Sequence, residues 1–287
     1  MTDKSQSPAW RHLGLVAGGG PLPLILAHSA CAQGKTVSIV PIEGFADQNW
    51  DGYTARRFRV EEIAAVRDHF SSQGVDAITF AGLVRRPDMQ TVEPVRLDSA
   101  AEQALRKAAR QGDDQLLRGV IAYFEEAGFA VIGMADIAPA HMLHEGLAGA
   151  CAIPDAVRED CERGAQIARR IGALDIGQSV VVAQGVVLAV EAQEGTAAML
   201  ARCADLPEAL RGTAGKRRGV FAKWAKPGQD RRIDLPVVGL DTINAVARAG
   251  LAGLVLEAGA VVLLEPEAVI AEADRLGLFI LGMKAGG

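Results

Sequence analysis

Short apolar segments alternate with polar, turn-rich segments along the chain, and this pattern predicts an α/β fold. Residues 13–17 form an apolar run that ends in three glycines, residues 24–33 have a helical pattern, and residues 36–40 form a second apolar run. This order is β-turn-α-β, and a helix over 61–72 followed by an apolar run over 75–80 extends it. Crossovers of this length imply parallel strands with right-handed connections.

The remaining pattern of the N-terminal half predicts helices over 98–110 and 113–127 and a last strand over 129–132. We therefore expect a Rossmann-like N-terminal domain with a parallel sheet over residues 12–135. From residue 136 to 154 the periodicity fades into Gly, Pro, His and Ala, which is typical of a linker.

Residues 155–287 have the pattern of a second, mixed α/β domain. A helix over 155–171 precedes two apolar runs, 180–183 and 186–190, and the two residues between these runs, Gln184 and Gly185, predict a β-hairpin. Antiparallel pairing therefore enters in this domain. The further elements expected are a helix over 196–203, a strand over 219–224, a helix over 241–249, a hairpin-like segment over 254–264, a helix over 265–275 and a strand over 278–281.

Charge and composition narrow the function classes. The net charge of -5 and the pI near 5.6 give no broad electrostatic footprint for nucleic acid. The four cysteines lack a C-x-x-C pair and read as reduced thiols, and His141 and His144 lack a third metal ligand. The first eleven residues lack the apolar stretch of a signal peptide, and the longest apolar runs are too short to span a bilayer. We expect a cytoplasmic protein that contacts a membrane surface at most peripherally.

The glycine turn at residues 18–20 lies where a parallel-sheet protein can bind phosphate. Amide groups at the start of a helix favour an anion, so Gly19 and Gly20 are candidate phosphate or ribose contacts. Glu43 follows the second strand, where a dinucleotide enzyme holds a ribose hydroxyl. Pro23 occupies the third glycine position of the dinucleotide fingerprint, however. An NAD-linked oxidoreductase is therefore one alternative, and a tight connection without a ligand is another.

The segment 223–236 is the most unusual in the chain. It combines four cations, two carboxylates and an amide in one turn-rich connection, and the candidates for binding or chemistry in it are Lys223, Lys226, Gln229, Asp230, Arg232 and Asp234. Cleavage of a diphosphate requires cations that offset phosphate charge and a carboxylate that holds Mg²⁺ or orients water. A solvated basic loop is the simpler alternative.

A second polar segment follows the predicted hairpin at residues 191–196. Its Glu194 and Thr196 either cap the next helix or face the same cleft as the basic loop. Their position at the end of a strand favours the cleft slightly.

Taken together, the motifs resemble those of the UDP-2,3-diacylglucosamine diphosphatases of lipid A biosynthesis, the type unrelated to metallophosphoesterases. The resemblance covers nearly the whole chain after the polar N-terminal tail. It is carried by residues 15–23, 80–82 with Arg86 and Pro87, 112–114 with 116–118, 175–178, 187–196, 226–236 and 250–259.

The resemblance implies hydrolysis of UDP-2,3-diacylglucosamine to UMP and 2,3-diacylglucosamine 1-phosphate (lipid X), with Mg²⁺ as cofactor and a homodimer as the assembly. It places the essential aspartate of the family at Asp234, as a metal ligand or a water-orienting carboxylate, with Asp230 beside it. Ala197 stands where we expect an acid, so metal binding would rely more on Asp230 and Asp234. A nucleotide-binding regulatory module without chemistry is a third alternative.

Overall fold

The computed structural model describes residues 9–84 and 113–284 of the chain. The predicted helix over 98–110 and the Arg86-Pro87 motif lie outside these residues. The chain divides into two compact units, Met1–Pro139 and Ala140–Gly287. The segment 136–154, which the sequence predicts as a linker, contains the end of helix α5, a 3-10 turn and the strand β6 (Gly146–Ala148), which pairs with a strand of the second unit. A three-residue strand is too short to produce a readable period.

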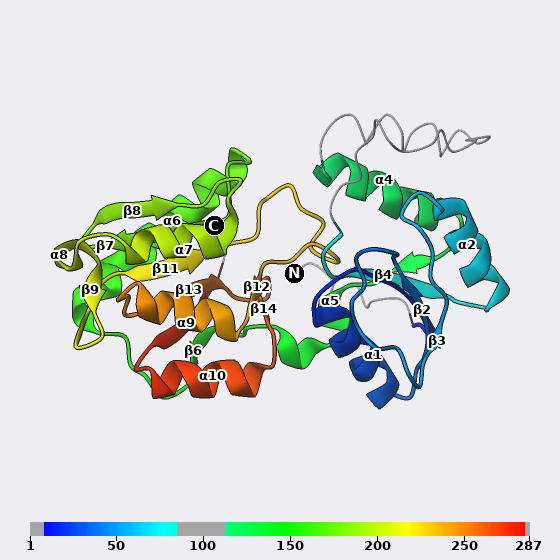
Figure 1. Ribbon diagram of the computed structural model, residues 1–287, viewed down its shortest axis with the longest axis horizontal. Helices are drawn as coiled ribbons and strands as arrows, with labels where there is room; N and C mark the ends of the chain where they lie inside the picture. Colours follow the sequence, from blue (N-terminus) through cyan, green and yellow to red (C-terminus); the bar gives the residue numbers. More distant parts are fainter. Residues whose placement is uncertain (1–8, 85–112, 285–287) are drawn as a thin grey trace, which may run out of the picture. The chain divides into compact units, whose positions relative to one another are not determined.

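The first unit contains a five-stranded sheet in the order β3-β2-β1-β4-β5, and every neighbouring pair in it is parallel. Helices α1 and α5 lie on one side of this sheet and α2 and α4 on the other (Figure 1). The elements are β1 (His12–Ala17), α1 (Leu22–Ala32), β2 (Thr36–Pro41), β3 (Thr54–Ala55), α2 (Ile63–Ser72), β4 (Ala77–Ala81), α4 (Asp113–Glu126), β5 (Ala130–Val131) and α5 (Met134–Ile137). The parallel sheet predicted from the crossovers is confirmed.

Strand β1 reads as a continuous apolar run because both of its faces are covered. Leu13 and Leu15 are fully buried on one face. On the other face, a Cβ at Gly14 would lie 2.9 Å from Val75 and 3.1 Å from the Phe70 ring, so α2 packs directly on the strand backbone. Central strands of parallel sheets have this property in general.

The second unit contains a six-stranded mixed sheet in the order β6-β15-β13-β11-β7-β8. Its elements are η1 (Pro139–His141, whose first residue closes the first unit), β6 (Gly146–Ala148), η2 (Asp155–Val157), α6 (Arg158–Ala173), β7 (Ser179–Ala183), β8 (Val186–Val190), α7 (Gly195–Ala204), α8 (Glu208–Arg211), β9 (Gly212–Thr213), β10 (Lys216–Arg217), β11 (Val220–Lys223), β12 (Val237–Val238), α9 (Leu240–Arg248), β13 (Gly253–Glu257), β14 (Val262–Leu263), α10 (Pro266–Arg275) and β15 (Phe279–Met283).

Helices cover both faces of this sheet, and the strand residues alternate between two apolar clusters. Val180 and Ala222 pack with α6. Val181 and Phe221 pack with α7, α9 and α10 on the opposite face (Figure 1). This alternation follows from the two-residue period of a strand. The predicted mixed α/β architecture is therefore confirmed.

The predicted hairpin around Gln184 and Gly185 is confirmed, because β7 and β8 pair antiparallel across these two residues. Both have positive φ, 53° and 74°, as a tight two-residue hairpin turn requires. The buried carboxylate of Asp160 in α6 accepts the N–H groups of Gln184 at 2.8 Å and of Gly185 at 2.7 Å. The turn is thus fixed to the helix that covers the sheet.

The predicted hairpin over 254–264 is wrong. Strand β13 lies between β11 and β15 in the six-stranded sheet, parallel to both. Strand β14 instead pairs parallel with β12 in a separate two-stranded sheet. The turn at Ala258–Ala260 therefore sends the chain to another sheet. In the described parts of the chain, no helix is long and apolar enough to cross a membrane.

Candidate functional site

The carboxyl edge of the six-stranded sheet collects buried polar side chains. Strands β8, β11 and β13 all end at this edge, and β7 begins there because it is antiparallel to its neighbours. The polar residues at these strand ends are each at most 6% exposed: Ser179, Lys223 and Glu257 are terminal residues of their strands, and Glu191 directly follows β8. Ligands of open α/β sheets bind outside the carboxyl ends of the strands, so this edge is the candidate site.

The strand register places three of these side chains on one face. Ser179 is directly opposite Lys223, and the Glu191 N–H donates to the Ser179 carbonyl at 2.9 Å. Opposite residues of paired strands point to the same face. Here that face is covered by α7, whose first turn carries Thr196.

Glu191, Thr196 and Lys223 form a hydrogen-bonded chain. The Thr196 hydroxyl donates to Glu191 Oε1 at 2.8 Å, and Lys223 Nζ donates to Thr196 Oγ1 and to the Val237 carbonyl, both at 3.2 Å. Burial lowers the pKa of the Lys223 ammonium, and the negative charge of Glu191 opposes that shift. The sequence favoured only slightly a position of Thr196 facing the same cleft as the basic loop, and the structure brings Thr196 into direct contact with Lys223.

Unpartnered polar atoms accumulate at the same edge. Among the described residues, Glu191 Oε2, Ser179 Oγ and Gln178 Oε1 are buried without a hydrogen-bond partner. Gln178 is next to Ser179 in sequence, and its carbonyl accepts the Trp224 N–H at 3.0 Å. Buried polar groups are normally paired, so such a group of exceptions indicates a place where a polar ligand or water completes the bonding.

Glu257 anchors the start of the basic loop from the opposite face of the sheet. It is 1% exposed, and its Oε2 accepts the Ala225 N–H at 3.0 Å while its Oε1 accepts Arg231 Nη2 at 2.8 Å. A buried carboxylate is tolerated where charged and backbone donors compensate it. Glu257 therefore fixes where the loop leaves strand β11.

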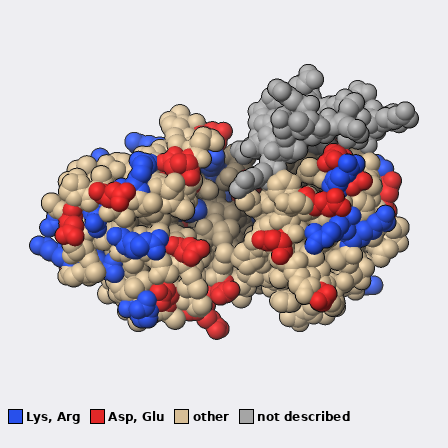
Figure 2. All heavy atoms as spheres, viewed as in Figure 1, with Lys and Arg blue, Asp and Glu red and all other residues tan. Residues whose placement is uncertain are grey.

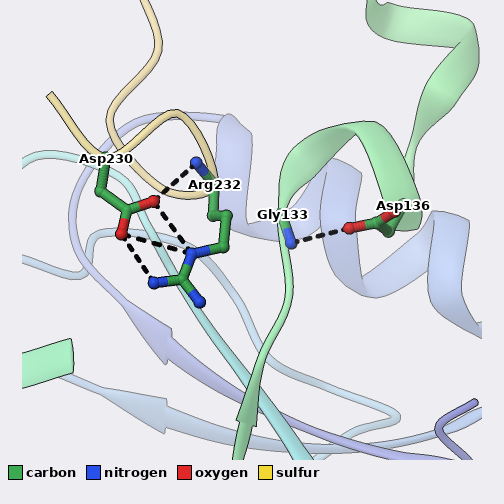
Figure 3. A network of polar contacts seen from close by, with 4 residues as sticks. All are labelled: Gly133, Asp136, Asp230 and Arg232. Carbon is green, nitrogen blue, oxygen red and sulfur yellow. Dashed lines mark hydrogen bonds and ion pairs between the residues drawn. The ribbon is translucent and has the colours of Figure 1, made fainter. Parts of the chain in front are cut away.

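The other loop cations are also paired with carboxylates. Lys226 Nζ lies 2.7 Å from Asp175 Oδ1, and the Lys226 N–H donates to Gln229 Oε1 at 3.1 Å. Arg232 binds Asp230 through Nε and Nη2, with a closest contact of 2.7 Å, as Figure 3 shows. The predicted concentration of cations is real, and carboxylates from within and outside the loop separate them.

Asp234 lies at the end of this loop and is partly exposed. Its N–H donates to the Asp230 carbonyl at 2.9 Å, and the Ile233 N–H donates to the same oxygen at 3.1 Å. Asp230 therefore organises the turn with its backbone and holds Arg232 with its side chain. The two predicted catalytic carboxylates belong to one turn, and Asp230 has a structural role in it.

Glu194 does not join the buried chain. Its side chain is engaged by Arg202 at 2.6 Å and by the Ala192 N–H at 3.1 Å. Backbone hydrogen bonds, followed by the Arg202 guanidinium, lower the pKa of Glu194. Glu194 is the N-cap residue of α7, but its side chain makes no capping hydrogen bond to the helix. Ala197, the position where an acid was expected, is exposed in α7.

The glycine turn of the first unit is closed by protein contacts. The N–H groups of Gly18 and Gly19 donate to the carbonyls of Ala81 and Leu83 at 2.8 and 2.9 Å, and the Gly20 N–H donates to Asp47 at 3.1 Å. These amides are engaged before any ligand arrives. The glycines are needed because a Cβ at Gly18 would lie 2.6 Å from the Leu83 carbonyl oxygen. The tight-connection alternative explains the turn.

Charge and metal-ligand patterns elsewhere are unremarkable. On the face drawn in Figure 2, Lys and Arg are interspersed with Asp and Glu and form no continuous basic surface. Among the residues whose positions are described, no group of three His, Cys, Asp or Glu residues could hold a metal ion. The four cysteines are free thiols.

Comparison with known proteins agrees with this two-part organisation. The family model of the LpxI N-terminal domain matches residues 12–141, and that of the LpxI C-terminal domain matches residues 144–281. The chain belongs to the LpxI family. The UDP-2,3-diacylglucosamine pyrophosphatase LpxI of Caulobacter vibrioides is 45% identical to this LpxI-family chain over 273 residues, which are 95% of this chain and 98% of the relative. A crystal structure of isoflavone reductase aligns with 96% of this chain and 80% of its own, at 11% identity and a TM-score of 0.27. The family resemblance read from the sequence is confirmed.

Sequence reasoning missed two residues of the site, Glu191 and Glu257. Each ends an apolar strand, and Glu257 interrupts the run 251–264. A carboxylate at the end of an otherwise apolar strand segment was the available signal. The strand pairing that brings the two residues to one edge could not be read from the sequence.

Proposed function

We propose that this chain hydrolyses the diphosphate of UDP-2,3-diacylglucosamine to UMP and 2,3-diacylglucosamine 1-phosphate in lipid A biosynthesis. The observation that carries the proposal is the 45% identity over 95% of the chain to a protein named for this pyrophosphatase activity. The charged edge of the second sheet gives the proposal a physical basis. An NAD-linked oxidoreductase is disfavoured because the amides of the glycine turn are engaged by protein acceptors.

The basic loop and the strand edge supply the charges that the reaction needs. Lys226 pairs with Asp175, whose side chain is 74% exposed, and such a surface pair is worth little in water. A diphosphate can therefore replace Asp175 at the Lys226 ammonium at small cost. Arg232 is held in place by Asp230, so its guanidinium is already oriented when the anion arrives.

Lys223 has a different role from the loop cations. Its ammonium is buried and is held in place by hydrogen bonds to Thr196 and the Val237 carbonyl, so its position does not depend on whether substrate is bound. A preorganised cation of this kind stabilises charge that develops on a phosphate oxygen or leaving group. We assign Lys223 and Thr196 to substrate binding and Glu191 to positioning them.

The carboxylates present fit a Mg²⁺ ion whose coordination is completed by the phosphates of the substrate. Mg²⁺ commonly binds one or two carboxylates together with substrate phosphates and water, and it does not need a cage of protein ligands. Asp234 would hold the ion, with Asp230 as a neighbour whose carboxylate already contacts Arg232. When bound, Mg²⁺ would offset phosphate charge and polarise the scissile anhydride. The carboxylate of Asp234 would also orient the attacking water.

Three broader features belong to the same proposal. We infer a cytoplasmic enzyme with peripheral contact at the inner membrane surface, since the substrate carries acyl chains. We also infer a homodimer, which the family resemblance supports, and we interpret the first unit as a Rossmann-like half because its first strand is central and followed by a glycine turn.

The test is a direct assay of the purified chain. With Mg²⁺ it should release UMP from UDP-2,3-diacylglucosamine, and excess EDTA should abolish the release until Mg²⁺ is restored. UDP-N-acetylglucosamine is the matched control and should be a very poor substrate, because binding energy from the acyl chains positions the reacting phosphorus. Equal hydrolysis of the two would reduce the proposal to a general diphosphatase, and no hydrolysis of either would refute it.

A further inference from the structure

A cavity in the first unit has no role in the chemistry proposed above. It has a volume of about 290 Å³ and is lined by β1, β4, α2 and α4 together with the segment after β2. Val16 and Phe80 come from the carboxyl-terminal halves of β1 and β4. The cavity thus lies at the carboxyl edge of the parallel sheet, where α/β proteins bind their ligands.

The walls select an apolar occupant. Phe124 and Val66 are buried in the floor, and Ile63 and Val120 are half-buried in the walls. Arg59 is the one charged side chain among the described lining residues. The neighbouring glycine turn presents no unengaged amide from residues 18–20, so the edge that binds phosphate in dinucleotide proteins is closed to an anion here.

The size of the cavity fits a medium-length hydrocarbon chain. An apolar cavity of roughly 150 Å³ binds benzene, which has six carbons. A volume of about 290 Å³ therefore corresponds to a chain of roughly ten to twelve carbons. The walls are built by two helices over a twisted sheet and are therefore curved. A flexible chain can adapt its shape to such walls, whereas most rigid ring systems of that size cannot.

The charge at Arg59 further restricts the ligand. Its guanidinium lies 3.3 Å from Glu61 and 3.8 Å from Glu62, so the charge of this cation is already balanced by two carboxylates. A free carboxylate would have to compete with both of them for Arg59. An acyl chain attached through a neutral amide or ester would not.

We infer that this cavity binds one fatty acyl chain carried on a neutral amide or ester linkage. Assigning that chain to the UDP-2,3-diacylglucosamine substrate rests on the proposed function. The preference for a neutral acyl chain rests on the cavity alone. The two parts can therefore be tested separately.

The binding test uses calorimetry on the full chain with N-octanoyl-, N-nonanoyl- and N-decanoyl-N-methylglucamine, below their micellar concentrations. Each buried methylene should tighten binding about fourfold. Decanoate, the anionic control of similar length, should bind at least tenfold more weakly than the decanoyl amide. A flat chain-length series, or equal binding of decanoate, would overturn the inference.

Variants place the binding in this cavity. Val120→Trp fills it from α4, and Val84→Asp, at a lining position that is 37% exposed, adds a charge without disturbing the core. The matched control is Leu83→Asp, because Leu83 is 64% exposed and does not line the cavity. Both cavity variants should lose the chain-length dependence while Leu83→Asp keeps it. Val84→Asp is the cavity variant that disturbs folding least. If it binds the acyl glucamides with the affinity and chain-length dependence of the wild type, the assignment of binding to this cavity is wrong.

The hydrolysis assay identifies the source of the chain. If the chain belongs to the substrate, Val84→Asp should raise KM for the long-chain substrate at least tenfold. The control variant Leu83→Asp should have the KM of the wild type. Chain-length-dependent binding with unchanged hydrolysis would support the cavity and assign its chain to another lipid. Binding by a protein that releases no UMP would refute the proposed function and leave this inference standing.

Discussion

Removing the charge of Glu191 should destabilise the second unit through Lys223. Lys223 Nζ lies 3.2 Å from Thr196 Oγ1, which lies 2.8 Å from Glu191 Oε1, so the two charges are at most about 6 Å apart. With the effective dielectric constant of about 20 that suits protein sites, their attraction is about 3 kcal/mol. Both side chains are 6% exposed, so water screens this attraction little.

A double-mutant cycle measures this attraction. Glu191→Gln should lower the free energy of unfolding by about 3 kcal/mol, because it leaves the Lys223 ammonium buried without its counter-ion. Lys223→Met should cost much less, because the lowered pKa of Lys223 means that the desolvation cost of its ammonium outweighs the attraction that is lost with it. The double variant should be about as stable as Lys223→Met, since it contains no unpaired ammonium. The expected coupling energy is therefore about 3 kcal/mol.

The assay is urea unfolding followed by tryptophan fluorescence. The chain has three tryptophans, and only Trp224 lies in the second unit, one residue after Lys223. In a Trp10→Phe/Trp50→Phe background the signal reports that unit alone, which avoids treating two units as one transition. Effects of the two substitutions that add within about 0.5 kcal/mol would show that the charges are independent, and would refute the role given to Glu191.

Three further results are expected. Asp234→Asn should lower kcat on the order of a hundredfold or more with the fold intact by circular dichroism, and Asp230→Asn should cost less or equally; near-normal turnover in Asp234→Asn would exclude that carboxylate. Because burial lowers the pKa of Lys223 below 10.5, the unfolded chain holds that proton more tightly, so the free energy of unfolding should rise with pH between the lowered value and 10.5. Lys223→Met should flatten that rise, and an unchanged slope would contradict it. Iodoacetamide should label the exposed Cys31 in the native protein. It should react with Cys161 only after unfolding, because burial raises the pKa of that thiol to about 12. Labelling of Cys161 in the native protein, detected by mass spectrometry, would contradict this prediction.

The local elements could be predicted where the sequence pattern alone determines them. The Gln184-Gly185 turn requires two residues with positive φ between apolar runs, and few dipeptides meet this requirement. The segment 254–264 has a similar pattern, with Gly259 at φ 71°, yet its two strands join different sheets. A turn residue shows where the chain bends, and the partner of each strand is decided by distant packing.

The charges of the basic loop could be counted from the sequence but not paired. Asp175 precedes Lys226 by about fifty positions, and Glu257 follows Arg231 by twenty-six. Both pairs depend on which strands are neighbours in the six-stranded sheet. The sequence showed the two carboxylates within the loop, but not the distant Asp175 and Glu257 that the fold brings to its cations. The contact between Lys223 and Thr196 was within reach of the sequence, because Lys223 lies at the end of one predicted strand and Thr196 shortly after another, and strand ends gather at one edge.

The carboxyl edges of the two sheets differ in chemical character. A glycine turn after the first strand of a parallel sheet usually accompanies nucleotide binding, but in this chain Ala81, Leu83 and Asp47 take up its amides and an apolar cavity lies beside it. The second sheet places Glu191 and Lys223 at the corresponding edge. A glycine turn after the first strand is therefore a poor guide to the ligand of the first unit, because the amides that would recognise a phosphate are engaged within the fold.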